Sequence, residues 1–302
     1  MEGQEDDKTI VQSLIGGSQL PFYLRCLKSL VTFCQDRIDL QLHTDGSLSQ
    51  EDNDFIHCEL DGTMVTITDS SENKNRVLDC LQGRPNCQKV RKDSIWGIEF
   101  FDPIFAFPED PISFYLDADI LFLRPFSGLF DRNQVQNGAV FLKDTQWDAY
   151  CFRPWQMLLG KNKPQAVKGI TTGLVFWDKT AIDWDYLEWF LGENHLHKIP
   201  EWIMPTAQAG LANRCEAKTI SPRHITNLYP NARIHEDTFG VHLLGSYRKS
   251  WMEKLEALEL EKIDVQNSPT IVPSFERCVS QNVFGYSLRQ IRRWKNTRLK
   301  IW

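Results

Sequence analysis

Paired carboxylates are the residues of this sequence with the clearest chemical potential. Asp-x-Asp triplets occur at residues 52–54, 117–119 and 183–185. The first lies in a hydrophilic run and the third beside a helical pattern with solvent-facing acids, so we interpret both as solvated. The middle triplet is different, because apolar runs precede and follow it. Carboxylates in such a context are costly to bury unless a partner compensates their charge.

A divalent cation is the simplest partner for Asp117 and Asp119. The two carboxylates follow a predicted buried strand at residues 112–116. Open α/β sheets bind ligands at the carboxyl ends of their strands, and hard oxygen ligands favour Mg²⁺, Mn²⁺ or Ca²⁺. The alternative is that the two carboxylates cap a turn or pair with Arg124.

The elements that position these residues follow from hydrophobic periodicity. Short β-like runs alternate with helical patterns through the first half, which is typical of an α/β layer structure. Strands are predicted at residues 8–14, 38–43, 64–69, 112–116, 138–142, 173–177 and 237–245. Helices are predicted at residues 20–34, 70–83, 94–107, 181–192, 204–214 and 250–263, with an acidic helix start within 44–58. Residues 266–275 contain two prolines and are the predicted linker.

Composition excludes several classes of protein. The 302 residues are 42% hydrophobic and 12% aromatic, which excludes a disordered or collagen-like chain. With 34 basic and 40 acidic residues, the net charge of −6 argues against nucleic acid as a partner. No apolar run reaches the ~18 residues of a membrane-spanning helix, and the acidic start differs from a signal peptide. The eight cysteines stand singly, without a CxxC pair, so we predict a reduced, cytoplasmic protein.

The C-terminal segment 287–302 is a separate feature. It carries six basic side chains and no acidic one, which leaves the rest of the chain at −12. As a helix, it places Leu288, Ile291 and Trp294 on one face. A basic amphipathic helix is typical of proteins that bind an anionic membrane surface, here the inner face of the membrane. Docking on the acidic body is the alternative.

Four segments, in a fixed order, resemble one family of enzymes. They are FYLDADILFLRP (114–125), Thr171-Thr172-Gly173, Gln208 with Asn213, and the segment from His242 to Trp251. The resemblance is to the retaining, nucleotide-sugar-dependent glycosyltransferases that include glycogenin and bacterial lipopolysaccharide galactosyl- and glucosyltransferases. It covers residues 8–251. It implies a Rossmann-like, single-domain A-type glycosyltransferase fold with a mostly parallel central sheet, here followed by a C-terminal helical extension.

The resemblance implies a metal site for Asp117, Asp119 and His242. The donor would be a UDP-sugar, and the cation would stabilise negative charge on the leaving diphosphate. Because an imidazole joins the two carboxylates, Mn²⁺ is preferred over Mg²⁺.

The same resemblance implies a diphosphate contact at the segment after His242. Gly245 would let the backbone approach the diphosphate, and a cationic side chain would neutralise it. The family's Lys falls on Arg248, with Lys249 one residue later, so either could be the contact.

Catalysis in the resembling family involves a Gln near the anomeric carbon, which corresponds to Gln208, while Thr172 could bind sugar hydroxyls. Retention would need no strong protein base, because the leaving phosphate can accept the acceptor's proton. An inverting enzyme would need a poised carboxylate, for which Asp144, Asp148 and Asp178 are available.

The end of the first strand is the predicted nucleotide cradle, since its backbone amides can contact base and ribose. Its members are Ser13, Leu14, Ile15 and Gly16. Tyr115, Leu116 and Ala118, around the first aspartate, are predicted to lie near the nucleotide, and Lys92 is the predicted contact to the donor sugar. The alternative for the glycine-containing end of the strand is a simple turn, and the alternative for Lys92 is a solvent-exposed charge.

These residues divide the chain into two predicted regions. Residues 1–251 would form the catalytic domain, with nucleotide binding in 1–124 and acceptor binding in 125–251. Residues 252–302 would form the helical extension with its basic tail. The predicted reaction moves a hexose to a glycan, a lipid-linked glycan or a protein. A sugar nucleotidyltransferase and a catalytically degenerate nucleotide-sugar-binding protein are the alternatives.

Overall fold

The computed structural model describes residues 8–146, 150–158, 163–256 and 268–299. The strands are β1 (Thr9–Ile15), β2 (Ile38–Thr44), β3 (Val65–Asp69), β4 (Ile112–Leu116), β5 (Ile120–Phe122), β6 (Gly138–Lys143), β7 (Ile170–Asp178), β8 (Glu216–Ile220), β9 (Ile225–Asn227), β10 (Gly240–His242) and β11 (Phe275–Arg277). The helices are α1 (Leu20–Phe33), α2 (Gln50–Glu59), α3 (Ser70–Cys80), α4 (Pro85–Asp93), α5 (Ile95–Ala106), α6 (Arg132–Val135), α7 (Trp184–Gly192), α8 (Ile203–Ala212), α9 (Arg248–Glu256) and α10 (Val283–Leu299).

The predicted elements of the first half lie close to their observed positions, while helices α4 and α6 and strand β5 were not predicted. Helix α4 is largely polar, so it shows little of the apolar periodicity on which the prediction depended. It begins with a proline in its first turn, where proline is tolerated. Helix α5 continues through Pro103. Helix α9 covers the start of the helix predicted at 250–263, and residues 257–263 lie outside the described residues.

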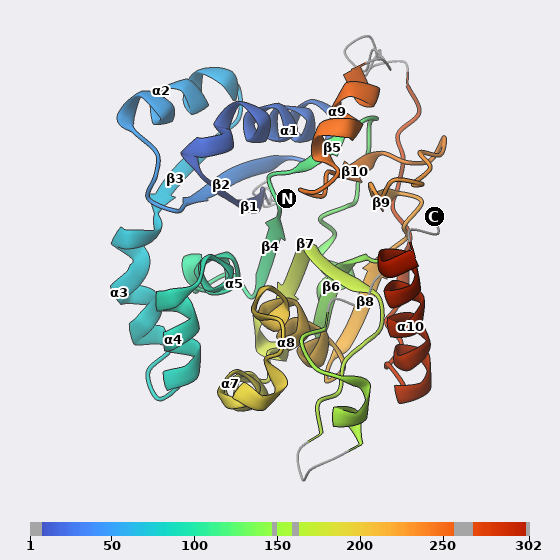
Figure 1. The fold of residues 1–302 in the computed structure, drawn as a ribbon. Coiled ribbons are helices and arrows are strands. Elements are labelled where there is room, and N and C mark those ends of the chain that lie inside the picture. Colours follow the sequence, from blue (N-terminus) through green and yellow to red (C-terminus); the bar gives the residue numbers. More distant parts are fainter. Residues whose placement is uncertain (1–7, 147–149, 159–162, 257–267, 300–302) are drawn as a thin grey trace, which may run out of the picture.

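An eight-stranded sheet in the order β11-β8-β6-β7-β4-β1-β2-β3 forms the centre of the molecule (Figure 1). Strands β3, β2, β1 and β4 are parallel to their neighbours, and β6 is parallel to β8. Strand β7 runs antiparallel to both β4 and β6, and β11 runs antiparallel to β8. The sheet is therefore mostly parallel, as predicted.

Two hydrophobic cores lie on opposite faces of this sheet. Along β7, Leu174 and Phe176 belong to the core with α1 and α2, while Val175 and Trp177 belong to the core with α3, α4, α5, α7 and α8. This alternation follows from the two-residue period of a strand, since both faces of the sheet are covered by helices. The ends of the strands are left free to form a site.

A second sheet, in the order β5-β10-β9, lies beyond the end of β4. Its apolar side chains pack with α1 and α9 in a third core that includes Leu121, Val241 and Trp251. Three residues separate the end of β4 from the start of β5, so the loop that they form joins the two sheets. That loop contains the middle Asp-x-Asp triplet.

The C-terminal segment returns to the body before it ends in a helix. The backbone N–H of Ile271 donates to the carbonyl of Pro125 at 2.9 Å, and β11 extends the central sheet at its β8 edge. The segment predicted to be a linker therefore lies along the body from residue 268 onward. Strand β11 is an edge strand that the prediction of a helical extension did not include.

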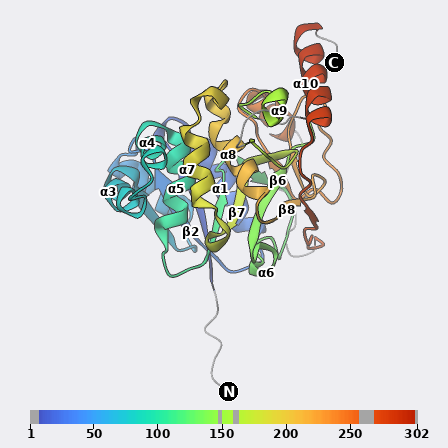
Figure 2. The ribbon, with the colours of Figure 1, turned by 90° about the horizontal axis from the view of Figure 1, so that it is seen from below.

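The buried side chain of Tyr286 helps to hold helix α10 on the body. Tyr286 is buried, packs edge-on against Tyr150 and Phe152, and donates its hydroxyl to the Phe152 carbonyl at 2.6 Å. Figure 2 shows α10 at the edge of the molecule, apart from the helices that cover the sheet. None of the described helices combines the length and apolar character needed to cross a membrane.

Candidate metal and nucleotide-sugar site

The middle Asp-x-Asp triplet lies at the point where β4 ends and the second sheet begins. The backbone N–H of Asp117 donates to the carbonyl of Gly173 in β7 at 2.8 Å, which fixes the start of the loop. The side chains of Asp117 and Asp119 are 27% and 15% exposed, so both carboxylates are mostly removed from water. The burial of these two side chains confirms that this triplet does not lie on a solvated surface. Arg124 does not pair with them, because its guanidinium donates to the Thr238 carbonyl.

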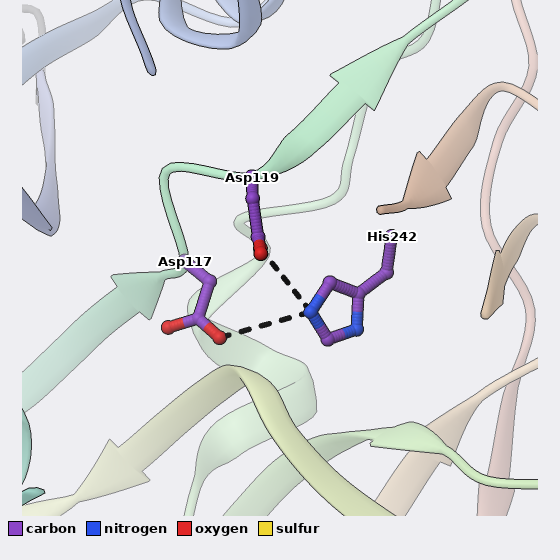
Figure 3. Close-up of side chains that lie close together, drawn as sticks. All are labelled: Asp117, Asp119 and His242. Carbon is purple, nitrogen blue, oxygen red and sulfur yellow. Dashed lines mark ion pairs between the residues drawn. The ribbon is translucent and has the colours of Figure 1, made fainter. Parts of the chain in front are cut away.

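His242 reaches the same point from β10. Strands β5 and β10 pair antiparallel with His242 opposite Ile120, and the N–H of Leu243 donates to the carbonyl of Asp119 at 3.0 Å. The Nε2 atom of His242 lies 3.2 Å from Oδ1 of Asp119 and 3.8 Å from Oδ2 of Asp117 (Figure 3). The structure thus brings together the three residues predicted as metal ligands, from segments about 120 residues apart in sequence.

The ring of His242 is held in one orientation by Asn227, which the sequence analysis did not identify. The Nδ1 of His242 lies 2.8 Å from Oδ1 of Asn227, and the amide of Asn227 donates to the Lys143 carbonyl at 3.1 Å. Because that second bond turns the amide oxygen of Asn227 toward the ring, Nδ1 carries a hydrogen, and Nε2 is the nitrogen that faces the carboxylates and could bind a cation after losing its proton. Such an outer partner is what a metal-binding imidazole requires.

Gly173 makes room for this imidazole. A Cβ atom at Gly173 would lie only 2.6 Å from Cε1 of His242. The register of β6 against β7 also shifts between Phe141 and Leu142, so the β7 residues around Gly173 form an irregularity in the ladder. Irregularities of this kind are frequent next to active sites, because they change the direction of a strand locally.

Burial and mutual repulsion perturb the titration of this group. Burial and the neighbouring carboxylate of Asp119 raise the pKa of Asp117 to about 7. Burial by itself would raise the pKa of Asp119. The charges and hydrogen bonds of His242 and Arg248 outweigh this effect, so the pKa of Asp119 is lowered. For His242, burial disfavours the charged ring, yet the two carboxylates prevail and raise its pKa. The group without a cation therefore holds protons that a cation would displace.

The donor set fits a divalent cation. Each of the three residues offers one ligand atom, and these atoms lie within 4.8 Å of one another. The Oδ1 atom of Asp119 is buried, and its neighbour is Nε2 of His242 at 3.2 Å, with no well-aligned hydrogen bond from the described part of the chain. A cation between the three ligand atoms would satisfy this oxygen fully. Two carboxylates and one imidazole are ligands that divalent metal ions accept.

Arg248 is the cationic side chain beside the carboxylates. Its Nη2 donates to Oδ2 of Asp119 at 2.6 Å, its guanidinium also donates to Gln19, and it stacks on the ring of Phe22 at 4.3 Å. Lys249, the other candidate for the diphosphate contact, is exposed. A Cβ atom at Gly245 would meet nothing within 4 Å, so packing within the described residues does not require glycine there.

The predicted nucleotide cradle lies at the end of β1, beside β4. The hydroxyl of Ser13 is buried and donates to the Leu116 carbonyl at 2.6 Å, so this side chain is already used. Gly16 has a packing role, because a Cβ there would lie 2.5 Å from a carboxylate oxygen of Asp45. It stays a prediction that a nucleotide contacts the backbone of this segment, which consists of Ser13, Leu14, Ile15 and Gly16.

Tyr115 lies between the candidate cation site and a pocket that its side chain lines. Its hydroxyl donates to Oδ1 of Asp117 at 3.0 Å, and burial, followed by the nearby carboxylates, raises its pKa, so it remains a donor. Leu116 and Ala118, on either side of Asp117, are buried. Their contacts to a nucleotide also stay predictions.

The pocket beside Tyr115 contains Gln208. Gln208 is only 3% exposed in α8, and Nε1 of Trp177 lies 3.5 Å from its Oε1. Glu99 of α5 and Ser113 of β4 also line the pocket. Thr172, half-buried in β7, lies in the irregular part of the strand next to Gly173. The roles predicted for Gln208 and Thr172 in catalysis are not tested by these positions.

Other predicted residues lie away from the three ligands or are already engaged. Lys92 is exposed on α4, whereas its neighbour Arg91 is buried and forms an ion pair with Asp102. Asp178 pairs in register with Ile112 at the opposite end of β4, and Asp144 accepts the Tyr229 hydroxyl at 2.8 Å. Asp148 lies outside the described residues.

Glu99 is a residue of this site that the sequence analysis missed. It stands in an apolar helix, as the aspartates stand between apolar strands, so the same argument from burial could have identified it. Burial, followed by the charges of Asp117 and Asp119, raises the pKa of Glu99 well above its ordinary range. Glu99 therefore lies close enough to Asp117 and Asp119 for their negative charges to disfavour its ionisation.

Comparison with known proteins shows the fold of this chain. The sequence matches no family model and no curated protein. The structure is similar to mouse xyloside xylosyltransferase 1 in its apo form, with a TM-score of 0.53 and 10% identity over 78% of this chain and 97% of that one. It is similar to the galactosyltransferase LgtC in complex with donor and acceptor sugar analogues, with a TM-score of 0.52 and 11% identity over 85% of this chain and 96% of that one. An active-site mutant of LgtC gives a TM-score of 0.51 and 13% identity over 78% and 88% of the two chains. The chain thus has the A-type glycosyltransferase fold, as predicted.

Proposed function

We propose that this protein is a metal-dependent glycosyltransferase that moves a hexose from a UDP-sugar to an acceptor. The observation that carries the proposal is the convergence of Asp117, Asp119 and His242 at the end of β4, where one ligand atom from each lies within 4.8 Å of the others. The A-type fold supports it, because the solved proteins of similar fold include an enzyme bound to donor and acceptor sugar analogues.

The three ligands would hold Mn²⁺ or, less favourably, Mg²⁺. Bound there, the cation would stabilise the negative charge that develops on the leaving diphosphate. Arg248 lies beside Asp119 and would donate to phosphate oxygens from that position. Asn227 would keep the ring of His242 in the tautomer that presents Nε2. Gly245 would leave space for the diphosphate against the backbone.

Retention of configuration is the proposed stereochemical outcome. In that reaction the leaving phosphate accepts the proton of the acceptor hydroxyl, and Gln208 and Thr172 would orient the sugar. Asp178 at the far end of β7 and Asp144 in its bond to Tyr229 are poorly placed to act as an inverting base. The anomeric configuration of the product, read by proton NMR, distinguishes the two outcomes.

Release of UDP tests the proposed reaction. The purified protein with UDP-glucose or UDP-galactose and Mn²⁺ should release UDP slowly, and Asp119→Ala should abolish that release. Asp54→Ala, at an exposed position of the Asp-x-Asp triplet on α2, is the matched control. Pyrophosphate formed from a nucleoside triphosphate would indicate a nucleotidyltransferase instead. Binding of UDP-sugar without turnover, with any acceptor tried, would indicate a degenerate binder.

An anionic membrane surface is the proposed location of the acceptor, which would favour a lipid-linked glycan over a free glycan or a protein. The apolar face of α10 is exposed, with Phe284 at 74%, Leu288 at 43% and Ile291 at 60%. These residues lie on the side of the helix opposite Tyr286, which holds α10 on the body. Because the helix docks through its other side, its apolar face is left available for lipid. The six basic residues of 287–302 complement an anionic surface.

Sedimentation with vesicles tests the membrane contact. The protein should sediment with phosphatidylglycerol vesicles at low salt, less at high salt, and not with phosphatidylcholine vesicles. A Leu288→Ser and Ile291→Ser double variant should lose most of this binding, while Val272→Ser, at an equally exposed valine on the body, should not. Equal sedimentation of the two variants would contradict the contact.

A further inference from the structure

Residues 166–169, here called the entry segment, lead directly into the irregular part of β7. The backbone N–H of Val167 donates to the carbonyl of Ala209 at 3.0 Å, and Ala209 is the residue after Gln208 in α8. At its other end the segment continues into β7, where Thr172 lies three residues beyond it. The entry segment therefore connects the two residues that are proposed to orient the transferred sugar.

The C-terminal extension pairs with the entry segment just before α10 begins. The backbone N–H of Lys168 donates to the carbonyl of Val279 at 2.9 Å, and the N–H of Gln281 donates to the carbonyl of Ala166 at 2.7 Å. An antiparallel bridge lies between these two bonds. Because main-chain bonds of this kind fix the register of two extended segments, residues 279–281 hold the entry segment in place.

Helix α10 adds a side-chain support through Tyr286. The hydroxyl of Tyr150 donates to the carbonyl of Val167 in the entry segment. The ring of Tyr286 packs edge-on against that of Tyr150, with the ring centroids 5.3 Å apart, and is only 1% exposed. Truncation of so buried a ring would leave a cavity beside Tyr150. Tyr286 thus acts on the entry segment through one intervening side chain.

Gly169 ends the entry segment in a conformation that favours glycine. Its φ is +64°, and a Cβ atom there would lie 2.7 Å from the carbonyl oxygen of Asp144 and 3.5 Å from Nη1 of Arg289. The carbonyl of Gly169 also accepts from the N–H of Asp144 at 2.8 Å. Helix α10 therefore approaches the entry segment a second time, at the point where it joins β7.

We propose that the C-terminal extension is part of the catalytic unit, with Tyr286 as a positioning residue that holds the entry segment and, through it, Thr172 and Gln208. This role rests on the proposed function, in which those two residues orient the sugar. The metal ligands have separate support, because β4 and β10 are fixed by their own strand pairing and apolar cores. Loss of the support from α10 should therefore slow sugar transfer more than it weakens nucleotide binding.

Kinetics and calorimetry of point variants of the full chain test this role. Metal-dependent UDP release is measured with UDP-glucose or UDP-galactose, and binding of UDP with Mn²⁺ is measured by calorimetry. Tyr286→Ala should lower kcat about 10- to 100-fold, the size of effect that a misplacement of about 1 Å produces. Its affinity for UDP should stay within about twofold of wild type. Tyr286→Phe keeps the ring against Tyr150 and should restore most of the lost kcat.

Gly169→Ala disturbs the entry segment from within and should also lower kcat while UDP still binds. Its matched control is Gly62→Ala, because Gly62 has a φ of +88° but a Cβ there would meet nothing of the described chain within 4 Å. For Tyr286→Ala the control is Trp155→Ala, at a nearby aromatic side chain that is 59% exposed. Both controls should keep the wild-type kcat. Tyr286→Ala and Gly169→Ala combined should lose less than the product of their separate effects, because both act through one segment.

Inactivity of the wild type and inactivity of the variants have different meanings. If wild type releases UDP from neither donor, the proposed function fails and the positioning role fails with it. If wild type is active and both Tyr286→Ala and Gly169→Ala keep its kcat, the positioning role is wrong while the proposed function stands. If kcat and UDP binding fall together, the extension only stabilises the fold, and the role is again wrong. Should Tyr286→Ala not fold, Tyr286→Leu, which retains an apolar side chain, replaces it in the same comparison.

Discussion

The ionised carboxylate of Asp117 destabilises the folded protein when no metal is bound, and Asp117→Asn should remove part of this destabilisation. The pKa of this carboxyl rises from an ordinary 3.8 to about 7 because of burial and the neighbouring Asp119. At about 1.36 kcal/mol per pKa unit, an ionised Asp117 at pH 8 costs the folded state up to about 4 kcal/mol relative to the unfolded chain. Asparagine keeps an acceptor for the Tyr115 hydroxyl and removes the charge. We expect it to recover about half of this cost, ~2 kcal/mol.

The expected shift in thermal stability follows from the size of the chain. An unfolding entropy of about 2.1 cal/mol/K per residue gives ~0.6 kcal/mol/K for a chain of this length, so ~2 kcal/mol raises Tm by ~3 °C. The pH dependence has a definite sign. The folded state binds the proton of Asp117 more tightly than the unfolded state, so metal-free wild type loses stability as pH rises from about 4 to about 7. Asp117→Asn lacks that contribution and should be less sensitive to pH.

Thermal unfolding in EDTA, at pH 6 and pH 8, measures both effects. Asp54→Asn, at an exposed position of α2, controls for loss of a charge as such and should leave Tm within about 1 °C of wild type. Addition of Mn²⁺ should then raise Tm for wild type and Asp54→Asn but not for Asp117→Asn. A lower Tm for Asp117→Asn in EDTA at pH 8 would refute the idea that this carboxylate is strained by repulsion. An equal gain from Mn²⁺ in all three proteins would refute its role as a ligand.

Three further predictions concern the same region. Calorimetry should show Mn²⁺ binding about tenfold weaker at pH 6 than at pH 8, because a carboxyl with a pKa of about 7 must lose its proton to bind metal. Gly173→Ala should weaken Mn²⁺ binding about 10- to 100-fold by displacing His242, whereas Gly245→Ala, with open space around it, should leave Mn²⁺ affinity unchanged and weaken UDP binding only. In denaturant unfolding, Arg91→Ala should lose about 3–5 kcal/mol by stranding its buried carboxylate partner, while Lys92→Ala should change stability by less than about 0.5 kcal/mol.

The cation site was the part most accessible to prediction from sequence. Asp117 and Asp119 stand between two apolar strands, and that contrast separates them from the other triplets without any structure. The parallel strands around them were also predictable, because short apolar runs alternate with helical patterns. Placing His242 beside them needed the order of motifs, since nothing local to β10 distinguishes a ligand from a buried strand histidine.

The supporting residues were not predictable in the same way. Arg91 and Lys92 are adjacent and both basic, and only the orientation of α4 decides that the first turns inward to Asp102 while the second faces water. Asn227 acquires its role from the parallel pairing of β9 with β10, which places it opposite His242. Such roles depend on the register between distant segments, which local patterns do not encode.

Backbone pairing, more than the carboxylates themselves, assembles this site. The bond from Asp117 to Gly173 ties the triplet to β7, and the bond from Leu243 to Asp119 ties it to β10. Both use main-chain groups, so they form whether or not a cation is present. The apolar cores on either side fix the same strands. The two carboxylates are therefore held together against their mutual repulsion by a scaffold that does not need the metal. It follows that chelation should empty the site without unfolding the protein, and that repulsion relieved by the cation contributes to its affinity.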